Sequence, residues 1–152
     1  MIITSKDNEN IKNIKKLKEK KYRDINSEYI IEGVKLINEA IAESAEIKTV
    51  VICEPCVKAG EIDSKTLYEI AKYNCIYVDE KVFNTVTDVQ NPQGILAVIE
   101  KNKEDEDIKY DEDVIVILEN IQDPGNLGTI LRTVDSVRVK TSNNIWYGFR
   151  CI

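Results

Sequence analysis

The sequence lacks the features that mark membrane and secreted proteins. Its 152 residues contain no apolar run that approaches the roughly eighteen residues of a membrane-spanning helix. The first seven residues have neither the basic head nor the apolar run of a signal peptide. A hydrophobic content of 43% is enough for a core, and the length suits one domain or two small ones. We therefore expect a soluble, cytoplasmic protein with no membrane partner.

Histidine is absent, and the four cysteines do not replace it as metal ligands. Cys53 and Cys56 have the spacing of metal and redox sites, but a zinc site needs four ligands. Cys75 and Cys151 form no second pair. A thioredoxin-type site would need its first cysteine to open a helix. Because reduced cysteines commonly serve as small apolar residues, we expect no metal site.

Charge is unevenly distributed along a chain whose net charge is −6. Residues 6–23 contain eight Lys and Arg against three acids, whereas residues 104–113 contain seven acids against one lysine. The basic segment is either an ordinary solvated helix or an electrostatic contact for phosphate groups. The stretch 101–113 is nearly free of apolar residues and cannot offset its ordering entropy, which predicts a solvated linker.

Alternating strand and helix patterns in residues 1–100 predict a small α/β domain. Strands are expected at 28–32, 47–53, 75–78 and 94–100, and helices at about 8–20, 34–41, 64–71 and 80–86. Ser5 or Asn8 would cap the first helix, Ser64 the third, and Gly33 would turn the chain into the second. The stretch 54–63 is predicted to be a loop. One helix face is expected to be buried: Val34, Leu36, Ile37, Ala40 and Ile41.

Residues 114–118 are uninterruptedly apolar, the pattern of a strand buried on both faces. Pro124 forces Asp123 towards an extended conformation, so a helix cannot begin earlier, and Asn126 is a suitable N-cap. An apolar helix face follows: Leu127, Ile130, Leu131 and Val134. Open α/β sheets usually bind ligands at the carboxyl ends of their strands, which is where the polar loop after residue 118 lies. Alternatively, the polar residues of this loop only make a turn. A Gly-x-x-x-x-Gly-Lys-Ser/Thr phosphate loop is absent.

A longer pattern overlaps this loop and helix: Asn120-x-x-Asp123-Pro124-x-Asn126-Leu127-Gly128-Thr129-Ile130-x-Arg132-Thr133-x-Asp135. It resembles the first signature motif of the SpoU/TrmH-type RNA ribose 2'-O-methyltransferases. Three further motifs resemble parts of the amino-terminal substrate-binding domain in that family: Ile14-x-x-Leu17 followed by Lys20-Lys21-x-Arg23, then Ile31-Glu32-Gly33-x-Lys35-Leu36, and Asn91-Pro92-Gln93-Gly94-Ile95. The resemblance spans about residues 3–136.

The resemblance implies a fold and a domain order. Residues 1–100 would form an α/β sandwich built like certain small RNA-binding ribosomal proteins, followed by the acidic linker. Residues 114–152 would hold the first βα unit of a knotted, SPOUT-type α/β methyltransferase domain. The family uses S-adenosylmethionine, but two later motifs that form its pocket have no counterpart here. We expect that pocket to be missing, through truncation, a frameshift or a genuine short variant.

The candidate site residues fall into three groups. The resemblance places Asn126 and Arg132 at the reaction centre, although Asn126 could instead cap the helix. Because guanidinium stays protonated, Arg132 suits phosphate positioning and alkoxide stabilisation better than proton removal. The supporting loop comprises Glu119, Asp123 and Gly128. The expected RNA contacts are Lys15, Lys16, Lys20 and Lys21 from the charge pattern, and Arg23, Glu32 and Gly33 from the resemblance.

Two functions follow from this sequence, and S-adenosylmethionine binding discriminates them. One is an RNA 2'-O-methyltransferase of ribosomal or transfer RNA, and the other is a non-catalytic RNA-binding module. We expect this chain to retain RNA binding only. For Glu32 and Gly33 a purely structural role is the alternative to RNA contact: Glu32 would form an ion pair with a lysine, and Gly33 would only make the turn. One predicted helix covers one face of the strand 114–118. Either the last seventeen residues, 136–152, and a second chain in a homodimer cover its other face, or the segment is poorly ordered.

Overall fold

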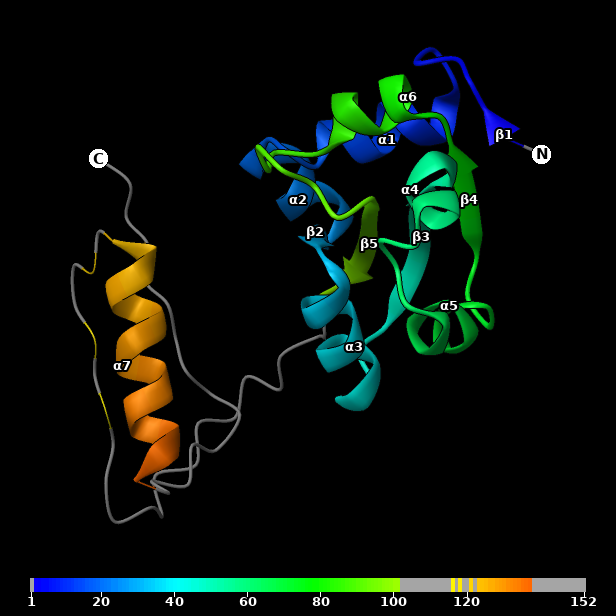
Figure 1. Ribbon diagram of the computed structural model, residues 1–152. Helices are drawn as coiled ribbons and strands as arrows, with labels where there is room; N and C mark the ends of the chain where they lie inside the picture. Colours follow the sequence, from blue (N-terminus) through cyan, green and yellow to red (C-terminus); the bar gives the residue numbers. More distant parts are fainter. Residues whose placement is uncertain (1, 102–115, 117, 119–120, 122, 138–152) are drawn as a thin grey trace. The chain divides into compact units, whose positions relative to one another are not determined.

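The computed structural model describes residues 2–101, 116, 118, 121 and 123–137. The chain divides into two compact units, Met1–Asn102 and Lys103–Ile152 (Figure 1). The elements of the first unit are, in order, β1 (Ile2–Ile3), α1 (Glu9–Lys16), α2 (Lys20–Asn26), β2 (Glu28–Glu32), α3 (Val34–Ala42), β3 (Ile47–Cys53), α4 (Glu54–Ala59), α5 (Ser64–Ile70), β4 (Cys75–Val78), α6 (Glu80–Val86) and β5 (Ile95–Glu100).

The five strands form one mixed sheet in the order β1-β4-β3-β5-β2. β1, β4 and β3 are parallel, whereas β5 is antiparallel to both of its neighbours. The central strands β3 and β5 are apolar at successive positions because helices cover both sheet faces. The four strands expected from the sequence are confirmed within one residue, and β1 is an additional short edge strand.

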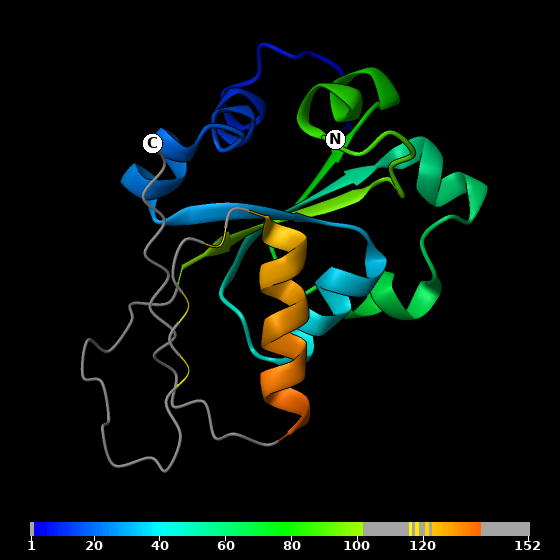
Figure 2. The same ribbon diagram turned by 90° about the vertical axis from the view of Figure 1, so that its left-hand side faces the viewer.

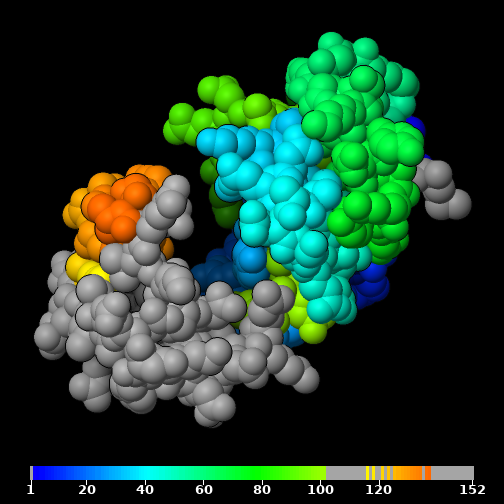
Figure 3. Space-filling model, turned by 90° about the horizontal axis from the view of Figure 1, so that it is seen from below, coloured from blue at the N-terminus to red at the C-terminus, as the bar shows by residue number. Residues whose placement is uncertain are grey.

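The alternation of side chains along β3 and β5 divides the core in two. Val51 of β3 and Leu96 of β5 face α1 and α6, while Val50 and Ala97 face α3 and α5. Figure 2 shows helices on both sides of the sheet, and Figure 3 shows α3 and α5 packed side by side. The expected α/β domain is therefore confirmed.

The first helix is shorter than its sequence pattern predicts. Asn8 caps α1 by accepting from the backbone N–H of Asn10 at 3.0 Å, and Ile11, Ile14 and Leu17 are buried as expected. The helix nevertheless ends at Lys16 instead of continuing to Lys20. Beyond Leu17 no apolar residue continues the buried stripe, so packing no longer favours one straight helix. The chain turns and begins α2, which sequence reasoning missed.

Three local expectations were also wrong. The predicted loop 54–63 contains α4, because Pro55 fits the first helical turn and Gly60 ends the helix with a φ of +77°. α5 is capped by Asp63 instead of Ser64, since the Asp63 carboxylate accepts from the N–H of Thr66 at 2.9 Å. Leu36 does not join the core, and 48% of it is exposed on α3.

In the second unit the structure describes mainly one helix, α7 (Pro124–Ser136). Its N-cap lies three residues earlier than predicted, at Asp123 instead of Asn126: the Asp123 carboxylate accepts from the N–H groups of Gly125 and Asn126. Most of the predicted strand 114–118 lies outside the described residues, and Val116 and Leu118 are not in a strand. The expected βα unit of a knotted domain stays a prediction. Within the described ranges, no helix is long and apolar enough to cross a membrane.

Candidate nucleic-acid interface

Four lysines at the end of α1 and the start of α2 form an exposed cluster, which we call the α1–α2 lysine cluster: Lys15, Lys16, Lys20 and Lys21. None of them pairs with a carboxylate among the residues that the structure describes. Seven other lysines in that part of the chain do: Lys12, Lys18, Lys35, Lys48, Lys58, Lys72 and Lys101. Two cluster members flank the half-buried Tyr22, with the Nζ atoms of Lys16 and Lys21 at 6.0 and 5.7 Å from its ring centroid.

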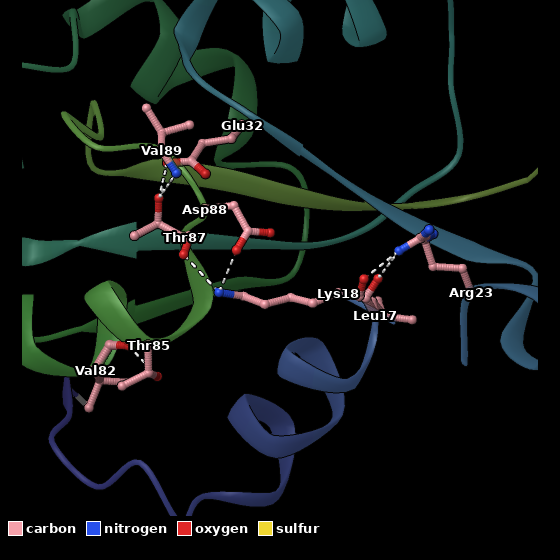
Figure 4. Close-up of polar contacts among 9 residues, drawn as sticks. All are labelled: Leu17, Lys18, Arg23, Glu32, Val82, Thr85, Thr87, Asp88 and Val89. Atoms are coloured by element: carbon pink, nitrogen blue, oxygen red, sulfur yellow. Dashed lines mark hydrogen bonds and ion pairs between the residues drawn. The ribbon is translucent and has the colours of Figure 1, made fainter. Parts of the chain in front are cut away.

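Arg23 joins the two helices that carry this cluster. Its half-buried guanidinium donates from Nη1 to the carbonyl oxygens of Leu17 at 3.0 Å and Lys18 at 2.6 Å (Figure 4). Both carbonyls lie just past the end of α1, where backbone acceptors lack helical partners. Arg23 therefore stabilises the turn between α1 and α2. Its expected contact with RNA stays a prediction.

Lys18 ties the end of α1 to the loop formed by residues 87–94, a contact that sequence reasoning missed. Its Nζ atom donates to the Thr87 carbonyl at 2.7 Å and lies 2.9 Å from the Asp88 carboxylate (Figure 4). Only 25% of its side chain is exposed. Nothing in the sequence separates Lys18 from the lysines around it, because its partners lie about seventy residues further along.

Glu32 and Gly33 lie where β2 meets α3, beside the 87–94 loop. The Glu32 carboxylate accepts from the Thr87 hydroxyl at 2.6 Å, so its described partner is a threonine and not the lysine that the sequence suggested. Gly33 has a φ of +97°, and an added Cβ would lie 2.9 Å from Oε1 of Gln93. That oxygen accepts from the N–H of Val34 at 3.0 Å and caps α3. A glycine is therefore required at position 33.

The Cys53–Cys56 pair lies at the start of α4. Cys53 stands at the helix N-cap, as a thioredoxin-type site requires, but it is fully buried. Burial, followed by hydrogen bonds with Cys53 and Glu61, raises the pKa of the Cys56 thiol to about 12. A thiol with such a pKa is protonated at neutral pH and is a weak nucleophile. Within the described part of the chain, His, Cys, Asp and Glu side chains form no group of three or more that could hold a metal ion.

On α7 the two candidate catalytic residues share an exposed face. Asn126 and Arg132 lie with Thr129 and Thr133 opposite the half-buried apolar residues of the helix. Arg132 donates from Nη2 to the Thr129 hydroxyl at 3.1 Å. A Cβ on Gly128 would lie 3.5 Å from Arg132 Nη1, an ordinary contact, so that glycine is not sterically required here. Asp123 caps the helix, and Glu119 lies outside the described residues.

Comparison with known proteins gives one consistent result. Residues 8–97 match the family described as the MRM3-like substrate binding domain. The chain is 31% identical over 134 residues to the 23S rRNA (guanosine(2553)-2'-O)-methyltransferase RlmP of Bacillus subtilis (strain 168), covering 88% of this chain and 50% of that protein.

Solved structures agree. The crystal structure of an AdoMet-bound rRNA methyltransferase from Sinorhizobium meliloti is 34% identical, with a TM-score of 0.69 over 90% of this chain and 51% of that chain. A structure described as an RNA 2'-O ribose methyltransferase is 28% identical, with a TM-score of 0.67 over 91% of this chain and 53% of that chain. The chain thus spans about half the length of these relatives. It belongs to the MRM3-like substrate-binding domain family and is a relative of the SpoU/TrmH-family RNA methyltransferases.

Proposed function

We propose that residues 2–101 bind RNA for ribose 2'-O-methylation and contact its phosphates through the α1–α2 lysine cluster. The observation that carries this proposal is that four adjacent, exposed lysines have no carboxylate partner in the described part of a chain with a net charge of −6. An ammonium group that is not held in an ion pair is available to an external anion. Binding to phosphates then releases counterions, which favours association.

The surrounding contacts support a preorganised surface. Arg23 holds α2 at the end of α1, Lys18 and Glu32 both hold Thr87, and Gln93 caps α3 beside Gly33. These bonds fix the cluster, the β2–α3 turn and the 87–94 loop relative to one another within the first unit. Groups that are already fixed lose less conformational entropy on binding. Relatives that are described as rRNA methyltransferases favour ribosomal RNA as the substrate, with transfer RNA as the alternative.

Salt-dependent RNA binding by the full chain tests this proposal. Fluorescence anisotropy with a labelled ribosomal RNA fragment would be measured between 50 and 200 mM KCl. Replacing Lys15, Lys16 and Lys20 with glutamine should reduce the log–log salt slope by about 2, since each phosphate contact contributes about 0.7 to 0.9. The control replaces Lys58, Lys65 and Lys72 and loses the same charge. Equal slopes for both triple variants would refute the proposed role of the cluster.

Methyl transfer by this chain is the second candidate, favoured by the shared face of Asn126 and Arg132 on α7. The reaction needs S-adenosylmethionine held in line with a ribose hydroxyl. A molecule of that size needs a concave pocket lined by several chain segments. The described residues of the second unit provide one convex helix, Pro124–Ser136, and do not fit the donor.

Donor binding separates the two candidates. Calorimetry of the full chain with S-adenosylmethionine should show no binding, and total RNA should gain no radiolabelled methyl groups. Methyl transfer that is abolished by Arg132→Ala would instead establish catalysis by this chain.

A further inference from the structure

A cavity of about 630 Å³ opens between α4, α6 and the 87–94 loop. Its floor includes two buried side chains, Cys53 and Phe83, which are 0% and 1% exposed. The loop lies directly against this floor, because a Cβ on Gly94 would be 2.6 Å from the Cys56 sulfur. The volume is within the range of about 300–1,000 Å³ that is typical of small-molecule sites.

The charge of the cavity wall excludes a phosphate group as the occupant. Among the residues that the structure describes, no lysine or arginine lines the cavity, and two carboxylates do, those of Glu61 and Glu80. The other polar wall groups are neutral amides: Asn84, Gln90, Asn91 and Gln93. Each amide both donates and accepts hydrogen bonds. Neutral donors and acceptors above an apolar floor match a flat, uncharged heterocycle with polar edges.

The position of the cavity connects it to the proposed RNA surface. Residues 90–93 of the 87–94 loop form one of its walls, and Thr87 of the same loop is bonded to Lys18 and Glu32. Gln93 connects the cavity to the β2–α3 turn, because it lines the cavity and its Oε1 atom accepts from the N–H of Val34 at the start of α3. An RNA strand that lies on the lysine cluster and passes the β2–α3 turn would therefore reach the rim of this cavity.

We propose that the cavity binds one unpaired nucleobase of the RNA, an inference that rests on the RNA-binding function proposed above. Proteins read single-stranded RNA by separating its bases, stacking them on flat side chains and hydrogen-bonding their edges. Here the amides of Asn84, Asn91 and Gln93 address the edge, and the half-buried side chains of Cys56 and Pro92 offer apolar surface for the face. The lysines supply the phosphate contacts, and the cavity adds base selectivity.

Uncharged nucleosides test the cavity without any contribution from phosphates. Adenosine, guanosine, cytidine and uridine would be titrated separately into the ¹⁵N-labelled full chain. At least one should shift the side-chain amide signals of Asn84, Asn91 and Gln93 to saturation. Asn84→Trp places a large ring at the mouth of the cavity from an exposed position and should abolish the shifts of Asn91 and Gln93. Asn91→Ala should weaken the shifts of Asn84 and Gln93, while Asn26→Ala on α2 serves as the control and should leave all three unchanged.

Binding of a labelled RNA with unpaired bases completes the test. Asn84→Trp should weaken RNA binding about tenfold, the scale of one lost base contact, with an unchanged salt slope. Unaltered RNA affinity in this variant together with no nucleoside shifts would overturn the nucleobase proposal and leave the phosphate contacts standing. Nucleoside shifts without any RNA binding would overturn the RNA-binding function, and with it the occupant proposed here.

Discussion

Replacing Arg23 with glutamine should destabilise the first unit. The guanidinium makes two hydrogen bonds to carbonyls past the end of α1, at 3.0 and 2.6 Å. Hydrogen bonds from a charged group contribute about 1.5–3 kcal/mol each. The site is only half-buried, so water replaces part of this loss. We expect the free energy of unfolding to fall by about 2 kcal/mol, which corresponds to a Tm roughly 10 °C lower for a unit of this size.

Urea denaturation followed by circular dichroism would measure this change, with Lys21→Gln as the control. Lys21 loses the same charge from the same helix, but its side chain is exposed, so its effect should be within about 0.5 kcal/mol. Arg23→Lys should be intermediate, because an ammonium group does not reproduce the planar fork of guanidinium. If Arg23→Gln leaves stability unchanged and weakens RNA binding instead, Arg23 is a phosphate ligand and its structural assignment is wrong.

Three further outcomes are expected. Gly94→Ala should cost about 3 kcal/mol of unfolding free energy in urea denaturation, because it combines a φ of +75° with a clash against Cys56. Gly60→Ala has a similar φ and open space around it, so it should cost only about 1 kcal/mol; equal losses would refute the clash. The pKa of Cys56 in the folded state lies above its ordinary value of 9.0. The protonated thiol therefore contributes fully to the free energy of unfolding below pH 9, and this contribution is lost as the pH rises towards 12. Cys56→Ala should reduce that alkaline loss, and an identical pH profile would contradict it. Hydrogen bonds from Thr66 lower the pKa of Asp63, so acid should destabilise the wild type more than Asp63→Asn as the pH falls below about 4, and parallel acid profiles would argue against this.

The parts of the fold that sequence predicted well depend on local patterns. The strands β3 and β5 each contain an uninterrupted apolar run, residues 50–53 and 95–99, and Gly33 is the residue type that a positive φ favours. The break between α1 and α2 was missed because the lysine-rich stretch after Leu17 has good helix propensity. The sequence shows that no apolar residue continues the buried stripe at 18–21, but only the structure reveals that Arg23 bonds back across the turn.

In the candidate interface, too, the sequence predicted the local features and missed the contacts between distant residues. The lysine cluster was predicted from its net charge, but the lack of carboxylate partners depends on which acids the fold brings near. The contacts of Lys18 and Glu32 with Thr87 join residues that are 69 and 55 positions apart, and local sequence carries no signal for them. The helix cap at Asp123 was missed because Asn126 is an equally good capping residue by type.

Acetylation footprinting of lysines, with and without bound RNA, tests the central claim most directly. The full chain would be labelled with an amine-reactive acetyl reagent, digested and analysed by mass spectrometry at low salt. The account predicts that RNA protects Lys15, Lys16, Lys20 and Lys21 from acetylation and leaves Lys58 and Lys72 as reactive as in the free protein. Equal reactivity of the cluster in the presence and absence of saturating RNA would contradict it.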